Sequence, residues 1–305
     1  SSAALFGGAT PMDPVTSKNL TEEWNGSSWT EIADMSTARQ TLNGQGTSTL
    51  ALASGGQAPG GFQTATEELS MNAPVGAWST GTSMNTGKER TAGAGIYTAA
   101  LSFGGGTSTT PAATAINELW NGSTWTEVGD LNTVKNKHGG FGTSTAAICC
   151  GGGLPPSSSP DKSDLSETWN GSSWSEGNDM NTRREQMGVE TYNGTSWTEV
   201  ADLNTDRYLL AGAGTSTAAI AFGGNTDPGL KDLTESWNGS SWTEVNDLNT
   251  ARDSLYGFGT NASAIAFGGY ASTAKDLTED WNGASWSETS DMVSTASATK
   301  GSKNG

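Results

Sequence analysis

A tryptophan-containing unit repeats along this 305-residue chain and constrains the fold more than any other feature. Its clearest copy begins at Leu233, contains the sequence Trp-Asn-Gly-Ser-Ser-Trp, and continues through a glycine-rich stretch to Phe267-Gly-Gly. The second aromatic residue of the unit recurs at Trp29, Trp78, Trp125, Trp174, Trp197, Trp242 and Trp286. Five of the six intervals span 44 to 49 residues, and the fourth spans 23. Such periods, built from short strand-like segments, are typical of β-propeller blades that bury their faces against their neighbours.

The composition agrees with an all-β repeat protein, and the net charge disfavours some classes of binding partner. Glycine makes up 42 residues, and only 15% of residues are charged. The net charge of −17 disfavours nucleic acid and anionic membranes, because both need a basic surface. No run of 18 apolar residues is present, so we expect no membrane insertion. We expect residues 1–305 to form a single β-propeller domain, since closed propellers reach this length.

Four short strands are predicted in each unit. In the last full copy these are Asp253–Phe258, Ser263–Phe267, Leu277–Trp281 and Trp286–Glu288. Asn-Gly dipeptides favour the positive φ angles of tight hairpins, and one stands between the third and fourth strands of most copies. The residues flanking this loop, such as Trp281 and Trp286, should form a pair on one face of the blade. Recurrence of these pairs favours packing between blades over a sugar-stacking platform.

Seven hairpins of this type predict seven blade positions, one of them truncated around residues 181–200. Between Trp174 and Trp197 the chain lacks a second strand and its Gly-Gly doublet, so either that blade is a stub or residues are missing between Gly188 and Val189. The chain begins in the middle of a unit, at residues matching a second strand. We therefore expect the ring to close by pairing residues 297–303 with residues 3–6, which removes exposed strand edges.

Glutamates and basic residues also recur at fixed places in the repeat. A glutamate precedes the first aromatic residue by two positions in all seven copies: Glu22, Glu67, Glu118, Glu167, Glu190, Glu235 and Glu279. A basic residue follows Asn-Thr-x or its equivalent in six copies: Arg39, Lys88, Lys135, Arg184, Arg207 and Arg252. An active site is needed once, whereas these residues occur in nearly every unit. We therefore expect ion pairs or arginine–backbone contacts that hold strands together.

The layout resembles the kelch repeat family. The Gly-Gly doublet that closes the second strand matches, as do the aromatic residue in the third strand, the tryptophan in the fourth and the basic residue that opens the next repeat. Tryptophan stands where kelch repeats usually carry tyrosine, and the near-identical turn sequences are similar to those of kelch-type proteins encoded by bacteriophages. The resemblance implies a propeller of four-stranded antiparallel blades that serves as an interaction scaffold.

Residues suited to catalysis are few, so we expect no enzyme activity, cofactor or metal. One histidine, His138, cannot supply the several His and Tyr ligands of kelch-like copper oxidases. The adjacent Cys149 and Cys150 stand where other copies have small or apolar residues. A sialidase-like glycan hydrolase is a less favoured alternative, because it requires three convergent arginines. Most arginines here belong to repeat positions, which leaves Arg90 without an assigned role.

Five loops of variable sequence follow the Gly-Gly doublets and are the candidate binding surface. They span residues 57–65, 106–115, 153–164, 225–231 and 270–275, with Gln57, Thr107, Ser157, Asp227 and Tyr270 as representative positions. Variable loops on a constant frame are typical of recognition surfaces. We expect a non-enzymatic component of a bacteriophage virion surface or fibre, acting by adhesion or decoration in many copies. Its partners would be other virion proteins or host-surface glycans or proteins. The alternative is a secreted or cellular kelch-type adaptor for a protein partner.

Overall fold

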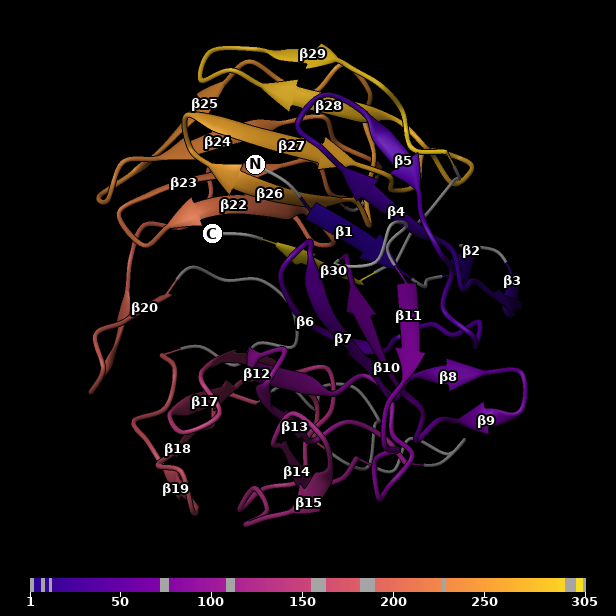
Figure 1. Ribbon diagram of the computed structural model, residues 1–305. Coiled ribbons are helices and arrows are strands. Elements are labelled where there is room, and N and C mark those ends of the chain that lie inside the picture. Colours follow the sequence, from indigo (N-terminus) through magenta and orange to yellow (C-terminus); the bar gives the residue numbers. More distant parts are fainter. Residues whose placement is uncertain are drawn as a thin grey trace.

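The computed structural model describes residues 3–6, 9–10, 13–71, 77–107, 113–154, 163–181, 190–226, 229–293 and 300–303 (Figure 1). All regular secondary structure within these ranges is β-strand. The chain therefore has the all-β composition expected from its repeats. No helix long and apolar enough to span a membrane occurs in the described part of the chain.

Six antiparallel sheets of four strands form the blades of a β-propeller. The first three, from the inner strand outward, are β30 (Lys300–Lys303), β1 (Ala3–Phe6), β4 (Thr21–Trp24) and β5 (Trp29–Glu31); β6 (Asn43–Gly46), β7 (Leu50–Ser54), β10 (Thr66–Ser70) and β11 (Ala77–Thr80); and β12 (Ala92–Ile96), β13 (Ala99–Phe103), β14 (Asn117–Trp120) and β15 (Trp125–Glu127). The other three are β16 (Gly139–Gly142), β17 (Ala147–Cys150), β18 (Ser166–Trp169) and β19 (Trp174–Glu176); β22 (Ala211–Thr215), β23 (Ala218–Phe222), β24 (Thr234–Trp237) and β25 (Trp242–Val245); and β26 (Tyr256–Thr260), β27 (Ser263–Phe267), β28 (Thr278–Trp281) and β29 (Trp286–Glu288).

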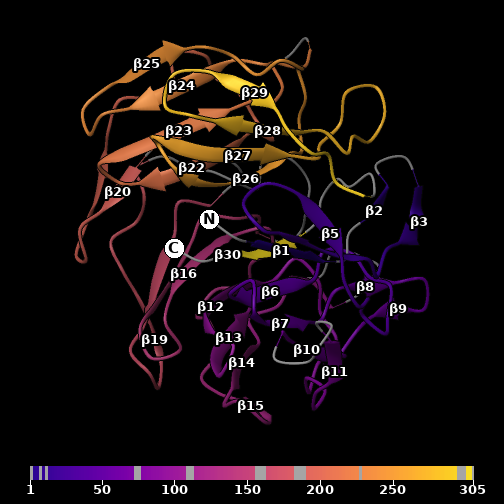
Figure 2. The ribbon, with the colours of Figure 1, turned by 45° about the horizontal axis from the view of Figure 1, so that its top comes forward.

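Neighbouring blades contact each other through their inner strands. Strand β6 lies against both β30 and β12, β12 also contacts β16, and β22 contacts β26 (Figure 2). The blades therefore follow one another around the molecule in chain order. Three two-stranded sheets complete the structure: β2 (Ala9–Thr10) with β3 (Asp13–Ser17), β8 (Gln57–Ala58) with β9 (Gly61–Phe62), and β20 (Glu190–Tyr192) with β21 (Trp197–Glu199).

The two ends of the chain share one blade. Strand β30 pairs antiparallel with β1, with Ala3 opposite Lys303 and Phe6 opposite Lys300. On its other side β1 pairs with β4, so residues far apart in the sequence complete a single four-stranded sheet. This pairing agrees with the closure expected from the repeats.

The expectation of seven blade positions with one truncated is corrected by the structure. In the short repeat, β20 and β21 pair only with each other among the described residues, so they form a hairpin and not a blade. In both ribbon views β20 lies apart from the four-stranded sheets. The physical reason is length, because 23 residues between Trp174 and Trp197 cannot supply an inner pair of strands as well as the hairpin. The Gly188–Val189 junction lies outside the described residues.

Tryptophans hold the blades together, as the repeat predicts. The residues that flank each Asn-Gly loop are opposite one another in the sheets, and their rings lie 5.3–5.6 Å apart in five pairs. The second tryptophan also packs on a phenylalanine of the preceding blade: Trp29 on Phe267, Trp174 on Phe103, and Trp286 on Phe222. The blade interfaces are therefore large apolar contacts.

Hydrogen bonds fix the orientation of these rings. Indole Nε1 of Trp29, Trp78, Trp125 and Trp286 donates to a threonine in the third strand of the preceding blade, at 2.9–3.0 Å. Most tryptophans are buried, whereas Trp78, Trp197 and Trp242 are half-buried. Trp242 Nε1 has no partner in the described residues, and Val189 stands at the sequence position where other repeats supply threonine, serine or asparagine.

Candidate functional site

The strand order places all variable loops at one end of the blades. Antiparallel strands alternate in direction, so the loops between second and third strands lie at the end where the chain passes to the next blade. The tight turns between first and second strands, and the Asn-Gly turns, lie at the opposite end. We call this end the loop face; the described parts of the variable loops there are residues 57–65, 106–107, 113–115, 153–154, 163–164, 225–226, 229–231 and 270–275.

Backbone bridges attach the variable loops to the frame. The first loop residue after each Gly-Gly doublet is bridged to the residue after the basic residue of the same blade, as in Gln40–Gln57, Tyr208–Asn225 and Asp253–Tyr270. Both Gln57 and Tyr270 are half-buried. The half-buried Thr107 follows Gly106, which is bridged to Glu89. The candidate positions Ser157 and Asp227 lie outside the described residues.

Among the described residues of the loop face, six that are not glycine adopt a left-handed backbone: Ser272 in the loop 270–275, and five that share one position of the repeat. These five stand two positions after the basic residue of their blades, at φ angles of 51–55°: Thr41, Arg90, Lys137, Leu209 and Ser254. Their backbones also connect neighbouring blades, since Arg90 N donates to Thr41 O and Ser254 N donates to Leu209 O. A left-handed non-glycine residue costs about 1 kcal/mol, and such positions concentrate at functional sites.

This ring of left-handed residues gives Arg90 a place in the repeat that the sequence did not reveal. Its side chain is 45% exposed and lies 3.5 Å from the Glu89 carboxylate. No glycine or asparagine marks the left-handed position in any copy, so the usual sequence signal for this conformation is missing. The same conformation delays the first strand of the last blade, which begins at Tyr256 and not at Asp253 as predicted.

In five blades, a buried ion pair joins the basic residue that precedes the first strand to a glutamate of the third strand. Guanidinium groups contact carboxylates at 2.9–3.0 Å and lysine ammonium groups contact them at 3.6 Å; the pairs are Arg39–Glu67, Lys88–Glu118, Lys135–Glu167, Arg207–Glu235 and Arg252–Glu279. The expected ion pairing between repeat positions is therefore present in five blades. Burial lowers the pKa of Lys88 to about 8, and the charge of Glu118 acts in the opposite direction.

Backbone contacts extend each of these pairs into a network. Arg207 Nη1 donates to Gly223 O at 2.7 Å and to Leu233 O at 2.6 Å, which links the basic residue to both ends of a variable loop. The paired carboxylate of Glu235 also accepts from Asn204 N at 2.6 Å. The glutamate therefore fixes the connection from the preceding repeat. The sequence had suggested ion pairs or arginine–backbone contacts, but not the hydrogen bond from the backbone of Asn204.

The glutamate of the closing blade takes part in the same blade-to-blade contact. Glu22 Oε2 accepts from Val293 N at 2.7 Å, although Val293 stands where most other repeats have asparagine. A carboxylate accepts this backbone bond whatever the side chain of the donor residue. The blade that contains both chain ends is thus joined to the last one by the usual contact.

The repeat arginines that the structure describes do not converge on a common point. Each of the three buried arginines, Arg39, Arg207 and Arg252, pairs with a glutamate of its own blade, so the three guanidinium groups lie in three different blades. No group of three or more His, Cys, Asp or Glu residues suited to a metal ion occurs in the ranges that the structure describes. Cys149 is buried, Cys150 is half-buried, and neither forms a disulfide bond. Burial raises the pKa of the Cys149 thiol, which disfavours the reactive thiolate.

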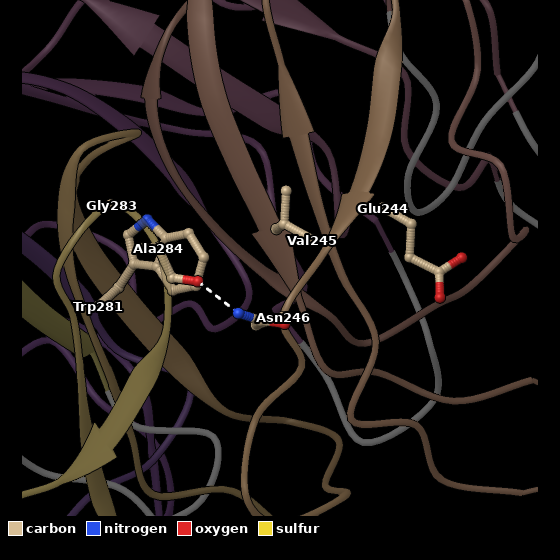
Figure 3. A pocket seen from close by; sticks show the side chains of 6 residues that line it. All are labelled: Glu244, Val245, Asn246, Trp281, Gly283 and Ala284. Atoms are coloured by element: carbon tan, nitrogen blue, oxygen red, sulfur yellow. Dashed lines mark hydrogen bonds between the residues drawn. The ribbon is translucent and has the colours of Figure 1, made fainter.

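A depression of about 450 Å³ lies between β25 and the loop that joins β28 to β29 (Figure 3). Its lining residues are Glu244, Val245, Asn246, Trp281, Gly283 and Ala284. Asn246 Nδ2 donates to Ala284 O at 2.8 Å and so connects β25 to the loop between β28 and β29. Figure 3 shows the Glu244 carboxylate pointing away from Trp281. Because its polar groups do not converge, this depression is a weaker candidate than the loop face.

Comparison with known proteins yields no relative from which a function could be transferred. No protein-family model matches the chain, and no curated protein matches it significantly in sequence. The functional argument therefore depends on the geometry described above.

Proposed function

We propose that the chain is a kelch-like propeller that acts by binding, as a surface or fibre component of a bacteriophage particle. The observation that carries this proposal is the contrast between a constant frame and a varied loop face. Ion pairs and tryptophan contacts repeat from blade to blade, whereas the loops differ in length and sequence. Rigid scaffolds that present divergent loops are suited to recognition.

The same geometry supports a non-enzymatic role. The repeat arginines are neutralised and buried in different blades, so they are unsuited to clamp one substrate carboxylate. The net charge of −17 favours solubility at high local concentration, as a protein displayed in many copies requires. The turn sequences that resemble those of phage-encoded kelch proteins support the virion assignment.

Locating the chain in native particles tests the proposal directly. Cryo-electron microscopy of intact virions should show many ordered copies at the particle surface or along a fibre, with the loop face in contact with a partner or exposed to solvent. Purification of the chain from cells in a stable complex with one non-virion protein would instead favour the adaptor alternative. Glycan-cleaving activity that is lost in the Arg90→Ala variant would favour a sialidase-like enzyme and overturn the proposal.

A further inference from the structure

Four residues form a row across the loop faces of the last two blades. Tyr208 is bridged to Asn225 in one blade, and Asp253 is bridged to Tyr270 in the next. Asn225 Nδ2 donates to Asp253 Oδ2 at 2.9 Å and joins the two pairs. Because bridged antiparallel residues lie about 5 Å apart, the row is roughly 15 Å long. We call Tyr208, Asn225, Asp253 and Tyr270 the tyrosine–aspartate row.

Asp253 lies at the centre of this row without a compensating positive charge. Its exposed fraction is only 7%, and it forms no ion pair with any lysine or arginine that the structure describes. Lys231 and Lys275 belong to the adjacent loops, yet neither pairs with it. Asn225 occupies Oδ2, and Oδ1 accepts no hydrogen bond from the described part of the chain. Asp253 Oδ1 is not among the fully buried atoms that lack a hydrogen-bond partner, so it remains accessible to a donor group from outside the protein.

The equivalent residue of another blade has a partner for both of its carboxylate oxygens, so the oxygen without a partner is a particular feature of Asp253. Glu89 occupies the same repeat position and has an exposed fraction of 6%. Its Oε2 accepts from Thr41 Oγ1 at 2.9 Å, and its Oε1 lies 3.5 Å from Arg90 Nη1. The carboxylate of Glu89 is therefore satisfied within the protein, whereas that of Asp253 is half satisfied.

We propose that the tyrosine–aspartate row binds a lysine or arginine side chain of a protein partner, with Asp253 as its counterion. The inference rests on the proposed function in assuming that the loop face binds. An ammonium or guanidinium group would donate to Asp253 Oδ1, and the aromatic residues at both ends of the row favour a cation. Tyr208 is 43% exposed, one of the more exposed large side chains in the described residues. The net charge of −17 attracts a basic partner from a distance.

A neutral sugar fits this row less well. Sugar hydroxyl groups both donate and accept hydrogen bonds, so their sites combine donors with acceptors. One of the two N–H groups of Asn225 Nδ2 is already committed to Asp253, which leaves its other N–H group and the two tyrosine hydroxyl groups as the donors of the row. A sugar would also leave the charge of Asp253 without compensation, whereas a cation neutralises it.

Matched peptides test the charge requirement. The probes are acetyl-Gly-Lys-Gly-Gly-amide and the same peptide with an Nε-acetylated lysine, titrated into the intact protein and followed by ligand-observed NMR. We expect the lysine peptide to bind at least tenfold more tightly than the acetylated peptide, with an affinity that falls as salt increases. Equal binding of both peptides, or preferential binding of a neutral oligosaccharide, overturns the inference.

Two variants locate the site. Asp253→Asn keeps the hydrogen bond to Asn225 and removes the charge, and it should weaken the lysine peptide at least tenfold. Glu89→Gln, at the equivalent and internally satisfied position, should leave its affinity within twofold of the wild type. An unchanged affinity in Asp253→Asn, with the tryptophan fluorescence of the native fold retained, refutes the row as the site. If instead the lysine peptide binds as expected but the chain is absent from virions, the proposed virion role fails and this inference stands.

Discussion

At the scale of single residues, the protein buries the charged side chains of its repeated ion pairs and neutralises them within the same blade. Arg207 illustrates the arrangement, since its guanidinium group contacts Glu235 at 2.9 Å and two backbone carbonyl groups of its own blade. The hydrogen bonds between these groups replace those that each group would form with water in the unfolded chain. Removal of one partner should therefore harm the protein more than removal of both.

Glu235→Ala should destabilise the protein by about 3–5 kcal/mol, because Arg207 remains buried without its counterion. Chemical denaturation at pH 7 measures this loss. Glu244→Ala, at an exposed glutamate of the same blade, should change stability by less than about 0.5 kcal/mol. The double variant Arg207→Met, Glu235→Leu should lose less than Glu235→Ala. An equal or larger loss in the double variant would contradict local compensation.

His138 occupies a repeat position that holds leucine at Leu42, Leu210 and Leu255. It is buried between two blades with neither ring nitrogen hydrogen-bonded, and burial together with the charge of Lys135 lowers its pKa to about 3. The unfolded chain binds a proton at this residue near pH 6.5, whereas the folded chain does not. Stability from His138 is therefore complete above pH 6.5 and is lost as the pH falls, by about 1.4 kcal/mol per unit.

His138→Leu should remove this contribution to acid sensitivity. Since His138 is the only histidine, the difference in unfolding free energy between wild type and variant should widen in favour of the variant from pH 6.5 to pH 5. Urea denaturation across this range gives the comparison. A constant difference over the range would show that the imidazole is protonated in the folded protein.

At the scale of elements, each blade is held to its predecessor by the second tryptophan of its hairpin. Trp286 packs on Phe222 with ring centroids 4.8 Å apart and donates to Thr234 Oγ1 at 3.0 Å. Trp242 follows the short repeat, is half-buried, and has an Nε1 atom without a partner in the described residues. Trp174 follows a complete blade and likewise has an Nε1 atom without a partner in the described residues, so this hydrogen bond is formed by only some of the hairpins.

Trp286→Phe should destabilise the protein more than Trp242→Phe, by about 1–2 kcal/mol, because only the first substitution leaves a buried threonine hydroxyl without its donor. Thermal unfolding of both variants provides the comparison. Combination of Trp286→Phe with Thr234→Val should be less destabilising than the sum of the single losses, with a coupling of about 1 kcal/mol. Strict additivity would show that the hydrogen bond contributes nothing.

At the scale of the whole molecule, the pairing of β30 with β1 joins the end of the chain to its beginning. The register from Ala3–Lys303 to Phe6–Lys300 makes the last strand the inner edge of the first blade, where it also contacts β6 of the next blade. A pairing of such high sequence separation constrains the ring as a covalent link between blades would.

Deletion of residues 300–305 should lower the midpoint of thermal unfolding and broaden the transition, because the first blade loses its inner strand and β6 loses a neighbour. Deletion of residues 304–305 alone leaves the paired residues 300–303 in place and should leave the midpoint within about 1 °C of the full chain. Calorimetry measures both. A sharp transition at an unchanged midpoint in the longer deletion would show that the ring does not depend on this strand.

Much of this architecture follows from local sequence. The Asn-Gly loops fix the hairpins, as the positive φ of Gly239 illustrates, and they set the register that places Trp237 opposite Trp242. Spacing of two residues puts Glu235 on the buried face beside Trp237, which is why the ion pair with Arg207 could be expected. These are short-range consequences of turn chemistry and strand alternation, and they repeat because the sequence repeats.

Other features depend on contacts that no local pattern specifies. The number of complete blades was decided by whether the strands of the short repeat find neighbours, and β20 and β21 find only each other. The left-handed conformation of Arg90 is imposed by its bridge to the neighbouring blade through Thr41 O, not by a glycine. The incomplete satisfaction of Asp253 likewise emerges only where two blades meet. Sequence alone thus determined the blade and its packing surfaces, because hairpin contacts are local. Tertiary structure decided the number of complete blades and the contacts of the loop face, because these form between repeats that are distant along the chain.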